Sequence, residues 1–79
     1  MRLNIISLKG VEFDGEISLL NLKTTSGEIT VLDHHRPLIT ALVKGRAILA
    51  KENRDVFNFD IKSGFLEVGD DNQVTLLAS

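Results

Sequence analysis

Asp33-His34-His35 is a run of side chains whose types could hold a metal ion or support acid–base chemistry. Adjacent residues of an extended segment point to opposite sides, so the two histidines cannot easily chelate one ion. A zinc site would need further ligands, and the chain has no cysteine to supply them. We therefore predict no metal site here. The histidines are interpreted either as turn residues or as a contact to a partner.

A second polar cluster, Asp70-Asp71-Asn72, carries oxygen ligands of the kind that calcium prefers. The cluster directly follows Gly69 and separates two apolar stretches. Asp and Asn favour turns because their side chains hydrogen-bond to the local backbone. The pattern therefore predicts a hairpin turn rather than a calcium site.

Catalytic motifs are not found along the chain. There is no Gly-x-Ser-x-Gly nucleophile elbow, no Gly-rich phosphate loop, and no spaced pair of carboxylates that stands out. A domain of 79 residues also has little room for a substrate pocket. We expect no catalytic residue, no cofactor and no enzymatic activity.

Length and composition indicate one globular domain, residues 1–79. The formal net charge is −2, and the chain has four Phe but no Tyr or Trp, which argues against nucleic-acid binding. The longest apolar run, Ala47–Ala50, is far too short for a membrane span. We therefore expect no direct insertion into a membrane.

Alternation of apolar and polar residues is the main structural signal. Phe57, Phe59 and Ile61 are separated by polar residues, and Val74 and Leu76 flank Thr75. This period of two puts successive side chains on opposite faces of a sheet. Glycine-containing turns punctuate the apolar stretches at the spacing expected for antiparallel strands. The predicted fold is all-β: a small antiparallel two-sheet β-sandwich or flattened barrel.

Three finer predictions follow from the same pattern. The apolar phase slips by one residue between Leu19-Leu20 and Leu22, which predicts a β-bulge. The segment Pro37–Leu42 is too short for a convincing helix and is interpreted as a strand. Parallel pairing needs long crossover connections, so we expect antiparallel pairs throughout.

Four stretches together resemble the amino-terminal β-sandwich domain of the epsilon subunit of F-type ATP synthases. Residues 27–45 are similar to its Gly-Glu, apolar strand, histidine turn and Pro-Leu-x-Thr-x-Leu. Residues 63–68 and 72–78 are similar to its Gly-Gly-Phe-x-Glu-Val hairpin and Val-Thr-Val-Leu-Ala ending. In the opening stretch, residues 3–7 and 13–16 are similar to its opening strand and Phe-x-Gly-x-Val. Asp33-His34 and Ser63 depart from the family pattern, which has Pro-Gly and Gly at these positions.

The resemblance implies a non-catalytic subunit of the central stalk, or rotor, of a proton- or sodium-translocating ATP synthase. Such a subunit links the gamma subunit to the c-ring and supports the coupling of ion flow to ATP synthesis. By resemblance, the gamma-facing residues are Ser7, His35 and Thr40, and the c-ring-facing residues are Glu28, Ile29, Thr30, Val31 and Leu32. The alternative interpretation is a stand-alone β-sandwich module that binds a ligand or peptide.

Longer members of the family continue into a helical hairpin that can latch the rotor and, in some members, bind ATP. The sequence ends after Leu77-Ala78-Ser79, either as a natural short form or as a truncated one. We therefore expect no nucleotide binding by these residues. The resemblance also implies a peripheral position on the cytoplasmic face of a bacterial inner membrane.

Overall fold

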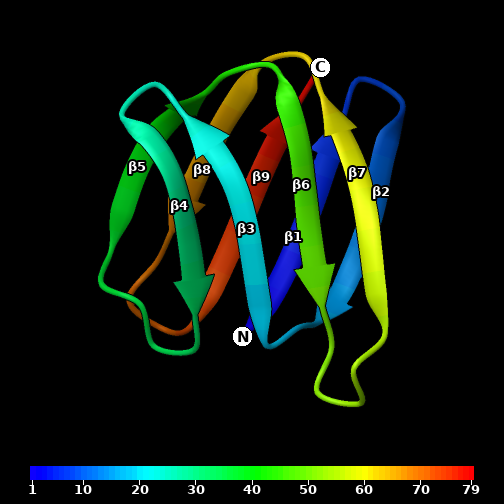
Figure 1. Cartoon of the computed structure of the whole chain (residues 1–79), viewed down its shortest axis with the longest axis vertical. Helices are drawn as coiled ribbons and strands as arrows, with labels where there is room; N and C mark the ends of the chain where they lie inside the picture. The colour runs from blue at the N-terminus through cyan, green and yellow to red at the C-terminus, as the bar shows by residue number, and fades with distance from the viewer.

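A computed structural model describes all residues 1–79 of the protein as nine β-strands without a helix (Figure 1). None of its elements is a helix that is long and apolar enough to cross a membrane. The strands are β1 (Arg2–Ser7), β2 (Gly10–Glu16), β3 (Leu19–Thr24), β4 (Gly27–Leu32), β5 (Leu38–Leu42), β6 (Gly45–Ala50), β7 (Val56–Ile61), β8 (Gly64–Val68) and β9 (Gln73–Ala78).

The strands form one sheet that curls into two layers. Its order is β2-β1-β9-β8-β5-β3-β6-β7, and β4 pairs with the free side of β3. The sheet changes layer between β5 and β3, where only Thr24 and Leu42 pair. In Figure 1, β4, β3, β6 and β7 lie in front of β8, β9 and β1. The predicted all-β flattened barrel is confirmed.

One strand pair contradicts the expectation of antiparallel pairing throughout. Strands β1 and β9 run parallel, with Leu3 opposite Val74 and Ile5 opposite Leu76. The argument from crossover length failed because these strands lie at opposite ends of the chain. Their connection is the whole of the intervening domain, so no short crossover is needed. All other strand pairs are antiparallel.

The core lies between the two layers and consists of sixteen buried apolar residues. Every strand except β2 contributes to it from its inward side: Leu20 and Leu22 from β3, for example, are at most 1% exposed. Phe13 and Phe59 are half-buried and pack against the edge of this cluster. The alternating apolar pattern of the sequence therefore marks the core-facing side of each strand.

The β-bulge predicted at Leu19–Leu22 is wrong. Strand β3 pairs with β4 in continuous register from Leu19 to Thr24. The phase slip arises because Ile17 belongs to the connection before β3 and is buried there, outside the strand pattern. The bulge of this sheet lies between β1 and β2, where the register shifts between Ile5 and Ile6. The strand predicted at Pro37–Leu42 is confirmed as β5.

Truncation of a core side chain should be costly in proportion to its burial. Leu66 is fully buried in β8, whereas Leu8 is fully exposed at the β1–β2 turn. We expect Leu66→Ala to lower the free energy of unfolding by about 2–5 kcal/mol in urea denaturation. The matched change Leu8→Ala should stay within about 0.5 kcal/mol of the wild type. Equal losses in the two variants would contradict the assigned core.

Candidate partner-binding surface

Apolar side chains cross the outer face of the β2-β1-β9-β8-β5 layer in a single row. Pairing joins Val11 to Ile6, Ile6 to Leu77, Leu77 to Phe65, and Phe65 to Ala41. Directly paired residues share one face of a sheet. We call these five residues the apolar row. Since neighbouring strands lie about 4.8 Å apart, the row extends for roughly 20 Å.

The apolar row is open to solvent. Phe65 is 58% exposed and Leu77 is 49% exposed. Two shallow hollows share these residues: one extends to Ile6 and Leu8 and the other to Ile39, which is 73% exposed. Contiguous exposed apolar surface of this kind marks an interaction site in a soluble domain.

The next row on this face is mostly polar. Asn4 pairs with Asp14 and Thr75, and Thr75 pairs with Glu67. The apolar surface therefore has a polar border on the side toward Arg2 and the β8–β9 turn. A hydrophobic patch with a polar rim is the usual anatomy of a protein–protein interface.

The outer face of the other layer has a different character. There Ile48 pairs with Asn58 and Asn21, and Asn21 pairs with Thr30. The Asn21 side-chain amide donates hydrogen bonds to Glu28 at 3.0 Å and to Thr30 at 3.0 Å. This network satisfies the polar groups within the layer. This outer face also has a shorter row of paired apolar residues, Leu32, Leu19, Ala50 and Val56. It contains no aromatic side chain, whereas the apolar row has Phe65 at its centre.

Sequence reasoning missed the apolar row, although a signal for it exists. A strand with one wet face should alternate, yet Ile5-Ile6, Phe65-Leu66 and Leu76-Leu77 are adjacent apolar pairs. One member of each pair is buried in the core and the other is in the row. The pairs alone could not show that the outer members align, because alignment depends on the register between distant strands.

The three residues that the resemblance assigns to gamma do not form one cluster. Ser7 lies at the end of β1, beside the hollow that contains Phe65, and its hydroxyl donates to Glu12 at 2.7 Å. Thr40 is half-buried and lies opposite the buried Leu66, so its side chain is on the core side of β5. His35 is in the β4–β5 connection, and its backbone N–H donates to the Leu32 carbonyl at 3.2 Å.

The residues assigned to the c-ring form strand β4 rather than a loop. Glu28, Thr30 and Leu32 are exposed, whereas Val31 is fully buried and Ile29 is half-buried against the core. Alternation therefore leaves the three exposed side chains available to a partner and engages the other two in the fold.

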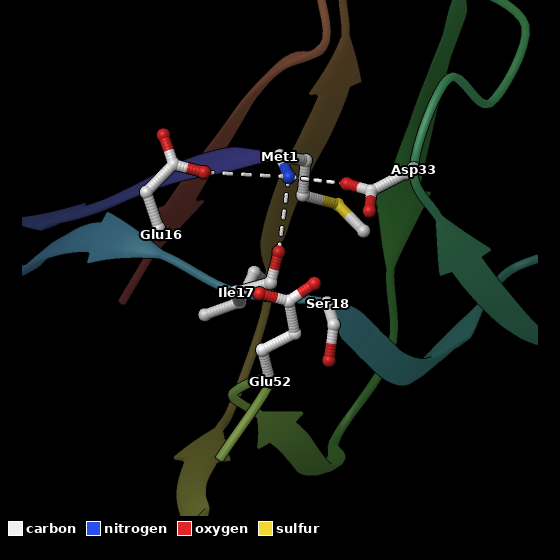
Figure 2. Close-up of a pocket in the computed structure, with 6 residues that line it drawn as sticks. All are labelled: Met1, Glu16, Ile17, Ser18, Asp33 and Glu52. Atoms are coloured by element: carbon white, nitrogen blue, oxygen red, sulfur yellow. Dashed lines mark hydrogen bonds and ion pairs between the residues drawn. The ribbon is translucent and has the colours of Figure 1, made fainter. Parts of the chain in front are cut away.

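A charged cluster surrounds the Met1 ammonium group at the end of the domain where the N-terminus lies (Figure 2). This group donates hydrogen bonds to the Asp33 carboxylate and, at 3.0 Å, to the Ile17 carbonyl, and it lies 3.5 Å from Glu16. The cluster lines a cavity of about 110 Å³ with Ser18 and Glu52. It joins the start of β1 to the β2–β3 and β4–β5 connections.

Mutual attraction shifts the pKa values of the Met1 ammonium and the Asp33 carboxyl in opposite directions. Burial lowers the pKa of the Met1 ammonium, but the hydrogen bond and charge of Asp33, with the charge of Glu16, outweigh it and raise that pKa above its ordinary 8.0. The hydrogen bond from the ammonium is the main cause that holds the pKa of Asp33 below its ordinary 3.8. A bond from the Asn72 amide at 3.4 Å acts in the same direction.

The two clusters considered as metal sites meet in the structure through Asn72. The Asn72 side chain accepts a hydrogen bond from the His34 backbone at 2.7 Å and donates to Asp33. Asn72 and His34 both have a positive φ of 61°, a conformation that Asn and His tolerate better than most residues. These residues therefore tie the β4–β5 connection to the β8–β9 turn, and the turn predicted at residues 69–72 is confirmed.

Comparison with known sequences gives one family. Residues 1–79 match the family described as "ATP synthase, Delta/Epsilon chain, beta-sandwich domain". The ATP synthase epsilon chain of Alkalihalophilus pseudofirmus is 35% identical over 99% of this chain and 57% of its own length. The epsilon chain of Pelotomaculum thermopropionicum is 38% identical with the same coverage. The chain thus spans a little over half the length of these relatives.

Solved structures show the same fold. A chain of the Euglena gracilis mitochondrial ATP synthase (OSCP/F1/c-ring) superposes with a TM-score of 0.90 and 22% identity, over 96% of this chain and 48% of that one. A chain of the Tetrahymena thermophila mitochondrial ATP synthase central stalk and c-ring gives 0.80 and 18%, over 99% and 62%. Both likenesses extend across the whole β-sandwich.

The Met1–Asp33 pair predicts a defined pH dependence of stability. Asp33→Asn should lower the unfolding midpoint at neutral pH. Because the pKa of Asp33 is lowered on folding, its contribution is present above pH 3.8 and is lost as pH falls through the folded pKa. Because the pKa of the ammonium is raised, its contribution is present below pH 8.0 and is lost as pH rises through the folded pKa.

Thermal unfolding of the wild type and of Asp33→Asn from acid to alkaline pH measures this effect. The difference in midpoint should be largest between pH 3.8 and pH 8.0 and should shrink as pH falls toward the folded pKa of Asp33 or rises toward the folded pKa of the ammonium. Asp70→Asn is the matched control, because Asp70 is an exposed turn residue that takes part in none of the ion pairs. A difference that stays constant across the whole range would contradict the role of the pair.

Proposed function

The chain belongs to the delta/epsilon family of ATP synthase β-sandwich domains, and from this membership we propose that it is a non-catalytic subunit of the central stalk of an F-type ATP synthase. In this role it links the gamma subunit to the c-ring and supports the coupling of proton or sodium flow to ATP synthesis. The observation that supports a linking role best is the apolar row. A monomeric module without a permanent partner would leave this surface in water.

We assign the gamma contact to the face that carries the apolar row. Ser7 borders this face, and Thr40 lies in β5 between Ile39 and Ala41, whose side chains point outward from it. The contact at Thr40 would thus involve its neighbours rather than its own half-buried hydroxyl. His35 precedes β5 and would extend the contact toward the other end of the domain. A stable interface on this face would bury at least about 1,000 Å² in total.

The c-ring contact is assigned to the exposed side of β4. Glu28, Thr30 and Leu32 project from the outer face of the second layer, away from the apolar row. Glu28 follows the β3–β4 turn, at the end of the domain that also carries the β1–β2 and β5–β6 turns (Figure 1). Two partners on separate surfaces can bind at the same time, as a linking subunit requires. The complex would place the chain peripherally, on the cytoplasmic face of a bacterial inner membrane.

Removal of apolar side chains from the row should weaken the gamma complex. The double variant Phe65→Ser/Leu77→Ser should raise the Kd for gamma at least about tenfold, which corresponds to about 1.4 kcal/mol, since buried aromatic anchors dominate interfaces. Isothermal titration with the isolated gamma subunit measures the change. Ile48→Ser/Val56→Ser, which removes exposed apolar side chains from the other layer, is the control. Equal weakening by both double variants would refute the assignment of this face.

Charge reversal at Glu28 tests the ring contact. Glu28→Lys should reduce reassembly of the catalytic head with the membrane sector, and the reduction should be greater at low salt, where charges are less screened. Exposed ion pairs contribute only about 0–1 kcal/mol each, so a modest effect is expected. Asp70→Lys makes the same charge change at the opposite end of the domain. A loss that is the same in both variants at every salt concentration would show that Glu28 has no specific role.

A further inference from the structure

Lysines gather at one end of the domain. Four of the five lysines lie there: Lys9 in the β1–β2 turn, Lys23 near the end of β3, Lys44 in the β5–β6 turn and Lys62 in the β7–β8 turn. In Figure 1 this is the end where the C-terminus lies. We call it the lysine end.

Neighbouring turns bring these lysines onto one surface. Lys44 and Lys62 line the same open groove together with Arg46. The Lys23 side chain packs over Gly45, the first residue of β6 and the neighbour of Lys44, so closely that a Cβ added to Gly45 would come within 3.2 Å of it. Lys9 lines the adjoining hollow with Phe59, which is two strand residues from Ile61. The positive groups thus form a band across the end of both layers.

The charge of this band is only partly balanced within the chain: Glu28 lies opposite Lys23 in the β3–β4 pair, and Glu12 shares a hollow with Lys9. All four lysines are exposed, and none takes part in an ion pair; Arg46 is the one basic residue of this end that does, with Asp60 at 3.2 Å. The half of the domain around the lysine end has five basic and three acidic residues, while the other half has four basic and eight acidic ones. The acidic residues near the lysine end are Glu12, Glu28 and Asp60. A chain with a formal charge of −2 therefore has a positive end.

Apolar side chains stand beside the lysines at two of the turn tips. Leu8, next to Lys9, is fully exposed, and Val43, next to Lys44, is 39% exposed. Neither residue packs against the core cluster. Apolar side chains flanked by lysines are typical of surfaces that lie in the headgroup region of a bilayer, where the apolar group enters and the ammonium stays at the phosphates.

The type of basic residue also distinguishes between ligands. Three of the four arginines lie in the other half of the domain, and the fourth is paired with Asp60. Lysine is a mobile point charge, whereas arginine forms fixed bidentate bonds with single carboxylate or phosphate groups. A band of lysines therefore fits a diffuse anionic surface better than one acidic peptide.

From these observations we propose that the lysine end binds the anionic headgroup surface of a phospholipid membrane. This goes beyond the stalk function, although the orientation it requires rests on that proposal. Glu28, one of the residues assigned to the c-ring, is the second residue of β4 and lies at the same end, so a chain seated on the ring would direct its lysines toward the membrane.

Vesicle co-sedimentation of the 79-residue chain tests the proposal without either protein partner. The chain should bind vesicles of mixed phosphatidylcholine and phosphatidylglycerol at low salt, lose this binding at high salt, and not bind vesicles of phosphatidylcholine alone. Each lysine near an anionic surface strengthens binding about fivefold, so Lys9→Gln/Lys44→Gln/Lys62→Gln should weaken it on the order of a hundredfold. Leu8→Ser should also weaken binding, with the salt dependence retained.

Matched controls make each result decisive. Arg36→Gln/Lys51→Gln/Arg54→Asn also removes three positive charges, but from the opposite end, and should leave vesicle binding unchanged. An equal loss in that variant, or no binding of the wild type to anionic vesicles at low salt, would overturn the proposal. Binding to poly-glutamate without binding to anionic vesicles would overturn it in favour of an acidic protein partner. None of these results alters the gamma titration, so the two proposals succeed or fail separately.

Discussion

The parallel pairing of β1 with β9 is the interaction on which the rest of the fold depends. It joins the first hairpin to the last one, so the layer β2-β1-β9-β8-β5 exists only when the two ends of the chain meet. The inward side chains of this pair, Leu3, Ile5, Val74 and Leu76, are at most 1% exposed. On the outward side the same pairing sets Ile6 beside Leu77. One long-range contact therefore completes the core and assembles the centre of the apolar row.

The strands could be predicted from the sequence because each one has a single face in the core. The alternation at Leu66 and Val68, or at Val74 and Leu76, is a local property of the chain and is read without knowledge of its neighbours. Pairing is not a local property. Strands β1 and β9 are separated by almost the whole sequence, and no turn residue signals that they meet. The β-bulge was wrongly predicted for a related reason. Ile17 is buried in the connection before β3, and an apolar residue in a buried connection cannot be distinguished from a strand residue by its apolar character alone.

The candidate surface was accessible to sequence reasoning only in pieces. Adjacent apolar residues such as Phe65-Leu66 indicate a strand with apolar side chains on both faces. Whether the outward side chains of several such strands line up into one surface depends on the register between the strands. The resemblance supplied His35, Thr40 and Val31 as contacts without the face on which each side chain lies. In the structure Val31 is in the core and Thr40 is on the core side of β5. A resemblance can therefore indicate which segment contacts a partner. Which of its side chains make the contact can be assigned only when it is known which residues of the strand face outward.

The placement of the surfaces fits the load that a stalk subunit would carry in the proposed role. The apolar row lies on the outer face of one layer, while Glu28 lies on the outer face of the other layer, so the gamma subunit and the c-ring would not compete for one surface. Leu8 lies where the apolar row meets the lysine end. Torque applied at the row would enter through β8, β9 and β1, the strands with continuous hydrogen bonding and fully buried inner faces. Close-packed interiors transmit strain because they have low compressibility.

The weak place of the barrel is the seam between β2 and β7, the two strands that end the strand order. These strands meet through the rings of Phe13 and Phe57, whose centroids lie 6.5 Å apart in a tilted arrangement. Ile6, Leu77 and Phe65 at the centre of the row lie in β1, β9 and β8, each of which is paired on both sides, and only Val11 lies in the seam strand β2. A partner held at the centre of the row would therefore pull on strands that are paired on both sides.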